Sequence, residues 1–189
     1  MGLLKKVVFL DRDGTINRDS ADYIKSRAEF EFIPGAVAAI SELTAGGFTC
    51  IVITNQSALA RGFISAAELD AMHAMMCAEV EAGGGKIADI FFCPHMPEDY
   101  CSCRKPATGL LLRAQQKYNI DLADAVIVGD SAKDIECGRA AGCGRTVLVK
   151  SGRNDDVEKQ LFKRQVAADY VATELLEAAR WIIADKARN

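Results

Sequence analysis

The chain has 189 residues, of which 50% are hydrophobic and 26% are charged, and its formal net charge at pH 7 is −3. This composition excludes a disordered or membrane-embedded chain, and the length fits one ordinary domain, which we expect to cover residues 1–189. The slightly negative charge provides no broad basic surface for a phosphate backbone, which argues against a nucleic-acid partner.

The first residues lack the pattern of an export signal. Lys5 and Lys6 precede a short apolar run that ends at the charged Asp11. Such a run is too short for the hydrophobic part of a signal peptide or for a membrane-spanning helix. We therefore expect a cytoplasmic protein without a membrane partner. Nothing in the sequence demands a partner chain, so we expect a monomer.

Strand and helix patterns alternate along the chain. A β-branched and aromatic run over 6–10 indicates a buried strand, and Pro34 and Gly46 delimit a helix by starting and ending it. Ser65 and Glu68 form a capping-box pattern that starts the next helix. In chain order we expect strands at 6–10, 48–53, 87–92, 125–128 and 146–149 with a short edge strand near 171, and helices at 34–42, 65–82, 108–118, 132–141 and 173–184.

This alternation predicts an α/β fold with a doubly wound, mostly parallel sheet and helices on both faces. In such sheets, ligands bind outside the carboxyl ends of the strands. Functional side chains are therefore expected in the loops that directly follow the predicted strands.

A pair of carboxylates follows the first predicted strand, because Asp11 and Asp13 are separated by a single residue. In phosphoryl transfer, one carboxylate can attack phosphorus. The other, protonated at first, can donate to the leaving oxygen and later take a proton from water. We expect Asp11 to be the nucleophile and Asp13 to be the acid and base.

Such a pair also indicates a cation. Mg²⁺ favours carboxylate, carbonyl and water oxygens, and it offsets the repulsion between an anionic nucleophile and a phosphate. Asp130 directly follows the fourth predicted strand, and Asp134 comes one helical turn later. We expect Asp130 to be the third acidic ligand, with Asp11 and Asp13.

Polar side chains also follow the second and third predicted strands. Thr54 offers a hydroxyl to a phosphate oxygen, Asn55, Gln56 and Ser57 add donors, and Lys105 can neutralise a transferring phosphoryl group. Each feature by itself is as consistent with a turn or a helix cap. Together they place an acid pair, a hydroxyl, a lysine and a further acid at successive strand ends, which favours an active site.

Three cysteines and a histidine cluster within one loop: Cys93, His95, Cys101 and Cys103. A Cys₃His set suits tetrahedral Zn²⁺, and four protein ligands leave no open position, so the expected role is structural. The metal would then position the basic pair that follows the last cysteine. The alternative is a reactive or incidental cysteine pair. The other histidine, His73, lies in a predicted helix away from this cluster and is expected to be structural.

Four segments resemble the motifs of the haloacid dehalogenase superfamily: Asp11-Arg12-Asp13-Gly14-Thr15, Thr54-Asn55, Lys105, and Gly129-Asp130 with Asp134. The resemblance covers essentially the whole chain and implies a Rossmann-like domain that hydrolyses phosphate esters through a phospho-aspartate, with Mg²⁺. Only a short stretch separates Thr15 from Pro34, where this superfamily usually inserts a cap. We therefore expect a minimal cap and an open site.

Three further segments, over 30–35, 54–62 and 103–106, look like those of the D-glycero-D-manno-heptose 1,7-bisphosphate 7-phosphatases. These enzymes serve heptose synthesis for lipopolysaccharide or surface glycans. The resemblance implies the following roles: Mg²⁺ ligands Asp11, Asp13 and Asp130, phosphoryl contacts from Thr54 and Lys105, recognition of a phosphorylated sugar by Arg104, and a sugar site lined by Asp19 to Tyr23 and Asn55 to Ser57.

Three other functions remain open from the sequence. The short loop between His95 and Cys101 resembles that of histidinol-phosphate phosphatases, which perform the same chemistry on an amino-alcohol phosphate. A zinc-stabilised binding module without catalysis is possible because fold alone does not guarantee activity, although the intact acid set argues against it. A nucleic-acid 3′-phosphatase could use the same acids, but the chain shows no basic stripe with interleaved aromatics.

Overall fold

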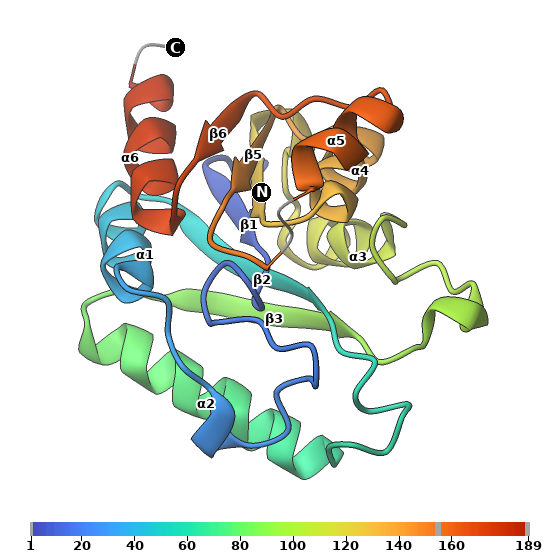
Figure 1. Ribbon diagram of the computed structural model, residues 1–189. Coiled ribbons are helices and arrows are strands. Elements are labelled where there is room, and N and C mark those ends of the chain that lie inside the picture. The colour runs from blue at the N-terminus through green and yellow to red at the C-terminus, as the bar shows by residue number, and fades with distance from the viewer. Residues whose placement is uncertain (1, 154–155, 188–189) are drawn as a thin grey trace.

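The computed structural model of the chain describes residues 2–153 and 156–187 (Figure 1). Its strands form one sheet in which every neighbouring pair is parallel. The strands are β1 (Val7–Leu10), β2 (Thr49–Asn55), β3 (Ile87–Cys93), β4 (Val126–Gly129), β5 (Arg145–Val149) and β6 (Tyr170–Ala172). The helices are α1 (Ala36–Ala45), α2 (Ala66–Ala82), α3 (Gly109–Tyr118), α4 (Ala132–Ala141), α5 (Val157–Lys163) and α6 (Leu175–Lys186).

The strand order across the sheet is β3-β2-β1-β4-β5-β6. The chain therefore builds outward from β1 in one direction and then, from β4, in the other. Two loops diverge where the order reverses, which opens a crevice at the carboxyl ends of β1 and β4. Asp11 follows β1 and Asp130 follows β4, so the topology places these two acids side by side.

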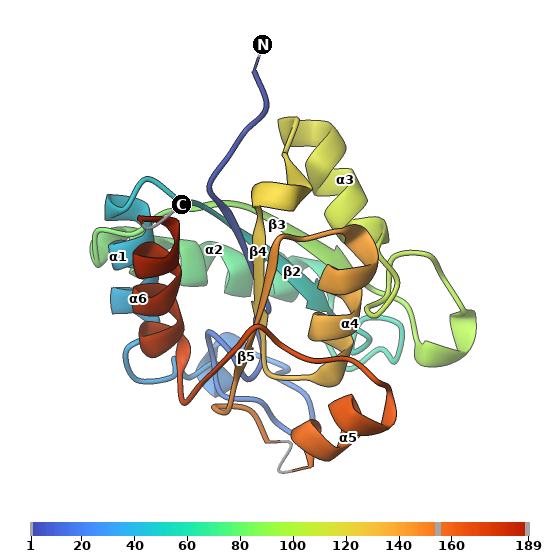
Figure 2. The same cartoon turned by 90° about the horizontal axis from the view of Figure 1, so that it is seen from above.

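Helices cover both faces of the sheet, as the alternating pattern predicted. Figure 2 shows α1 and α6 on one side and α3 and α4 on the other. Successive residues of β1 serve opposite faces: Val8 and Leu10 pack in the cluster with α1, α2 and α6, whereas Val7 and Phe9 pack in the cluster with α3 and α4. The predicted α/β fold with a doubly wound parallel sheet is confirmed.

Two local features differ from the sequence prediction. β2 extends through Asn55, so Thr54 belongs to the strand and does not follow it. Helix α5 was not predicted, because its segment is short and strongly charged and buries only Val157 and Leu161. These two side chains pack on Ile135 of α4, and such a tertiary contact cannot be predicted from local periodicity.

Within the described part of the chain, no helix combines the length and apolar character that a membrane crossing needs.

Candidate active site

Three carboxylates meet at the crevice between β1 and β4. One oxygen atom each from Asp11, Asp130 and Asp134 lies within 4.8 Å of the others, close enough for all three to contact one cation. Two glycines leave space for the carboxylate of Asp130. A Cβ atom at Gly14 or Gly152 would collide with the carboxylate of Asp130. The backbone therefore encloses Asp130 closely enough to fix its direction.

The buried ammonium group of Lys105 lies against this acidic group. Its Nζ is 2.9 Å from Oδ1 of Asp11 and 2.5 Å from Oδ1 of Asp134, and it donates to the carbonyl oxygen of Ile53 at 2.8 Å. Burial alone would lower the pKa of Lys105, but the two carboxylates raise it above its usual range. The lysine is therefore charged and is held in place by three oxygen atoms.

Asn55 anchors the backbone of Lys105. The lysine N–H donates to Oδ1 of Asn55 at 3.0 Å, and Nδ2 of Asn55 donates to the lysine carbonyl oxygen at 3.2 Å. On the other side, the carboxylate of Asp134 accepts from the hydroxyl of Ser131 at 2.6 Å. The lysine and its partner Asp134 are thus each held by a neighbour, which keeps the two charged groups in one arrangement.

The pKa values of Asp11 and Asp130 are raised because the acids are buried close together. Burial raises the pKa of Asp11 to about 7, although Lys105 opposes the shift. Burial, followed by the charges of Asp11 and Asp134, raises the pKa of Asp130 to about 9. Carboxyl groups that repel one another in a buried site favour a proton or a cation among them. The oxygen-only donor set fits a hard divalent cation such as Mg²⁺.

The carboxylate of Asp13 turns away from this group toward other donors. It accepts from Nε and Nη2 of Arg12 at 3.1 and 2.9 Å, from Asn17 at 2.9 Å and from Gln56 at 2.8 Å. Burial alone would raise the pKa of Asp13, but Arg12 and these hydrogen bonds lower it below its usual range. The sequence prediction missed Arg12 and Asn17 as partners, because their contacts depend on how the loop folds.

Thr54 lies beside this network at the end of β2. Its Oγ1 accepts from Nε2 of Gln56 at 2.8 Å, so its own proton is left to donate outward. The same Gln56 nitrogen contacts Asp13, and the residue is only 4% exposed. The amide nitrogen of Gln56 thus already donates to both Asp13 and Thr54.

A pocket of about 580 Å³ opens above these groups. Most of the residues predicted to contact substrate line it: Asp19, Tyr23, Asn55, Gln56, Ser57 and Arg104. Ala21 and Asp22, which belong to the predicted segment over 19–23, line a separate small pocket instead. The lining also includes three cations that the sequence prediction missed: Arg61, Lys133 and Arg153. Lys133 carried a local signal, because it lies in the first turn of the helix that follows Asp130. We call the acids Asp11 and Asp130 the acidic floor of the pocket. Its cationic rim is formed by Arg61, Arg104, Lys133 and Arg153.

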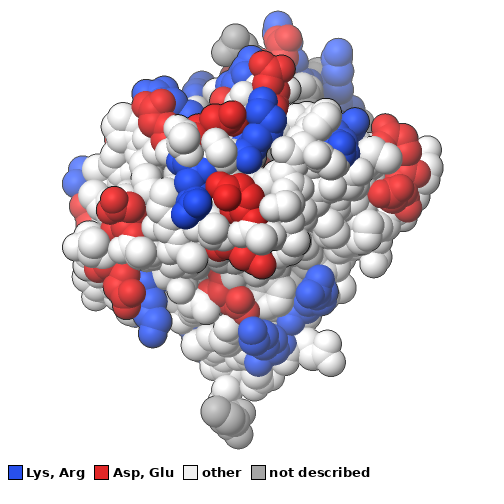
Figure 3. Space-filling model, turned by 90° about the horizontal axis from the view of Figure 1, so that it is seen from below, with Lys and Arg blue, Asp and Glu red and all other residues white. Residues whose placement is uncertain are grey.

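Charges elsewhere are mixed. On the face shown in Figure 3, acidic and basic side chains are interspersed among uncharged ones, and the described residues form no continuous basic surface there. The absence of a nucleic-acid partner stays a prediction.

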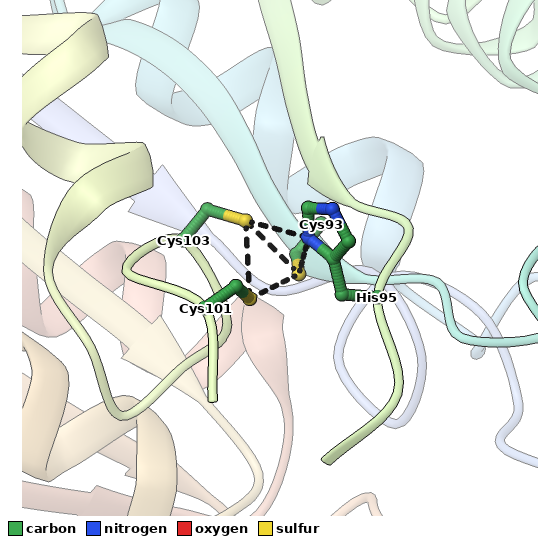
Figure 4. Close-up of side chains that lie close together, drawn as sticks. All are labelled: Cys93, His95, Cys101 and Cys103. Carbon is green, nitrogen blue, oxygen red and sulfur yellow. Dashed lines mark hydrogen bonds between the residues drawn. The ribbon is translucent and has the colours of Figure 1, made fainter. Parts of the chain in front are cut away.

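The predicted Cys₃His cluster is assembled beside the pocket (Figure 4). Cys93 ends β3 and His95 follows it, while Cys101 and Cys103 come from the segment that leads to α3. The sulfur atoms lie 3.2 to 3.5 Å apart, and Nδ1 of His95 is 3.2 Å from the sulfur of Cys103. Tetrahedral sulfur ligands about 2.3 Å from a zinc ion lie about 3.8 Å apart. A slight outward movement of the side chains would therefore admit the ion.

The chain can be compared with known proteins. The sequence profile of the haloacid dehalogenase-like hydrolases matches residues 7–139, and a related HAD-hydrolase-like profile matches residues 102–178. Two curated relatives bear the name D-glycero-beta-D-manno-heptose-1,7-bisphosphate 7-phosphatase. That of Pseudomonas putida is 43% identical over 94% of this chain and 99% of its own, and that of Pseudomonas aeruginosa is 46% identical over 79% and 83%.

A solved structure is also similar. The crystal structure of D,D-heptose 1,7-bisphosphate phosphatase from Bordetella bronchiseptica, complexed with magnesium and phosphate, superposes with a TM-score of 0.87. It is 37% identical and covers 95% of this chain and 99% of its own. The likeness therefore extends over nearly the whole of both chains.

If the Cys₃His cluster binds a structural zinc ion, Cys103→Ser will lower the zinc content, the melting temperature and the activity together. The metal would join the end of β3 to the segment before α3, so its loss frees the backbone on which Arg104 and Lys105 are carried. Zinc analysis, thermal melting and phosphatase assays check this. Cys77→Ser, outside the cluster, is the control. Full zinc content in the Cys103 variant contradicts the assignment.

Proposed function

Because the chain belongs to the haloacid dehalogenase-like hydrolases, we propose that it removes the 7-phosphate of D-glycero-D-manno-heptose 1,7-bisphosphate. The product is the heptose 1-phosphate. One observation carries the proposal: the acids Asp11 and Asp130 and the cation Lys105 meet at the reversal of strand order, under a pocket large enough for a sugar bisphosphate. The identity to the Pseudomonas putida phosphatase extends over nearly the whole chain.

The proposed reaction uses two carboxylates in turn. An oxygen of Asp11 attacks phosphorus, the bond from phosphorus to the sugar oxygen breaks, and Asp13 gives the departing oxygen its proton. The phosphoryl group is then bonded to the carboxylate of Asp11 as an acyl phosphate. Asp13, now ionised, takes a proton from water as the water attacks phosphorus, which releases phosphate and restores the Asp11 carboxylate.

The low pKa of Asp13 fits the second step directly, because an ionised carboxylate is ready to accept a proton. The first step needs the protonated form. A phosphate ester brings negative charge close to Asp13, and a nearby like charge raises the pKa of a carboxyl group. Substrate binding therefore favours protonation of Asp13 at the time when the leaving oxygen needs a proton.

Asp11 and Asp130 are the proposed side-chain ligands of Mg²⁺, and Asp134 lies within reach of the same ion. When bound, Mg²⁺ neutralises phosphate charge and stabilises the transferring group. The carboxylate of Asp13 is held by Arg12, Asn17 and Gln56 and does not belong to this group of acids, so its role as a metal ligand stays a prediction. Thr54 and Lys105 are the proposed phosphoryl contacts.

The cationic rim suits the second phosphate of the substrate. With the 7-phosphate on the acidic floor, the 1-phosphate extends toward Arg104, whose guanidinium is held by the carbonyl oxygen of His95 at 3.1 Å. Asp19, Tyr23 and the segment over 55–57 line the same pocket and are the proposed contacts of the sugar hydroxyls. The monomeric state and the cytoplasmic location stay predictions, as does the place in lipopolysaccharide or surface-glycan synthesis.

The test of this function is Mg²⁺-dependent phosphate release from heptose 1,7-bisphosphate, in both anomeric forms, beside histidinol phosphate at equal concentration. We expect a preference for the heptose of at least about tenfold in kcat/KM, because only this substrate offers a second phosphate to the cationic rim. A preference for histidinol phosphate would keep the chemistry and overturn the substrate.

The nucleophile is tested by Asp11→Asn. The amide keeps the shape of the carboxylate but cannot form the acyl phosphate, so we expect kcat to fall by on the order of a thousandfold or more. Circular dichroism and zinc content should stay unchanged. Asp70→Asn replaces an exposed aspartate of α2 and is the matched control. Phosphate release by the Asp11 variant near the rate of the control would rule out the phospho-aspartate.

The raised pKa of Asp130, about 9, predicts that metal binding depends on pH. Without a metal ion this carboxyl is largely protonated at pH 7, whereas Mg²⁺ binds the ionised form. Binding therefore releases protons, and the affinity for Mg²⁺ rises as the pH increases toward 9. Calorimetric titration in two buffers of different ionisation enthalpy measures this proton release. Equal heats in both buffers, with an affinity independent of pH, would contradict the prediction.

A further inference from the structure

Arg12 lies between Asp11 and Asp13 in the loop that follows β1, which we call the acidic loop, and its charged side chain is buried, with only 1% exposed. One edge of its guanidinium forms three hydrogen bonds with the carboxylate of Asp13. Nη2 donates to both carboxylate oxygens, at 2.9 and 3.0 Å, and Nε donates to one of them at 3.1 Å. Such a forked contact fixes the orientation of a carboxylate as well as its charge. The position of Asp13 thus depends on where Arg12 is held.

The other edge of the guanidinium is held by α2. Nη1 of Arg12 lies 3.2 Å from Nε2 of His73 and 3.6 Å from the sulfur of Met72, and the ring of Phe30 lies 6.0 Å from the guanidinium carbon. The thioether is a weak acceptor and the phenyl ring has no lone pair to offer. His73 is therefore the strong acceptor for this end of Arg12.

The chemistry of the contact defines the state of His73. Arginine has only donors, so Nε2 of His73 must be unprotonated and must accept. Burial, followed by the charge of Arg12, lowers the pKa of His73 to about 4, and the side chain is only 7% exposed. The imidazole is thus neutral at physiological pH, as the hydrogen bond requires. The sequence analysis predicted a structural histidine away from the Cys₃His cluster and did not include this contact.

We propose that His73 is a positioning residue for the reaction, which fixes Arg12 from α2 and through it orients Asp13 toward the leaving oxygen. The inference rests on the proposed function, because it gives Asp13 the role of general acid. A general acid matters most when the leaving group is an alkoxide, and it matters little when the leaving group departs without a proton. Loss of the positioning contact should therefore affect sugar phosphates selectively.

The deciding variant is His73→Phe, which keeps a ring of similar shape but removes the acceptor. The two substrates are heptose 1,7-bisphosphate, whose leaving group is an alkoxide, and 4-nitrophenyl phosphate, whose leaving group is a stable anion. The measured quantity is kcat/KM, which covers the steps up to departure of the leaving group. We expect about a tenfold loss on the sugar, out of the roughly hundred- to ten-thousandfold that general acid catalysis contributes, and little change on the aryl ester.

Two further variants separate positioning from folding. His73→Gln places an amide oxygen near the position of Nε2 and should restore the ratio of the two substrates, whereas the shorter side chain of His73→Asn should not. This pair decides the question even where the Phe variant does not fold. Met76→Ala removes a buried side chain one turn along α2 and should lower the melting temperature without changing the ratio.

The outcomes are distinguishable. An equal loss on both substrates in the His73 variants, or no loss on either, overturns the positioning role while leaving the proposed function intact. A selective loss on the sugar that Gln restores supports the role. If the unaltered protein releases phosphate from neither substrate, the proposed function fails, and the positioning role fails with it because Asp13 would have no leaving group to protonate.

Discussion

The site depends on a buried lysine among carboxylates. Lys105 contacts Asp11 and Asp134, and its charge offsets only part of the repulsion that these acids and Asp130 exert on one another. Burying such a group is costly unless its members are paired and hydrogen-bonded. The repulsion that remains favours a proton or a divalent cation among these acids, and in the proposed function that cation attracts the phosphate.

The rest of the fold holds these charges at fixed distances. The strand order brings the ends of β1 and β4 together, and glycines beside Asp130 let the backbone approach the carboxylate. Asn55, from β2, holds the backbone of Lys105, and the cysteine cluster lies directly before it in the chain. A rigid first layer of contacts with a supporting second layer is what pre-organised catalysis requires.

A second buried cation, Arg12, supports the other half of the chemistry. It pairs with Asp13 and extends to α2, so the acidic loop is tied to a helix far away in the chain. The two aspartates of one loop therefore have different surroundings: burial raises the pKa of Asp11, whereas Arg12 and its neighbours lower that of Asp13. Environments that separate the pKa values of two carboxyl groups allow them to take different roles.

Local periodicity and spacing in the sequence predict the alternation of strands and helices, the α/β class and the strand ends that Asp11 and Asp130 follow. Helix α5 and the contact of His73 with Arg12 depended on tertiary structure, since both arise between segments distant in the chain. Local patterns record which face of an element is buried. Which side chain it meets there is decided only when the elements pack.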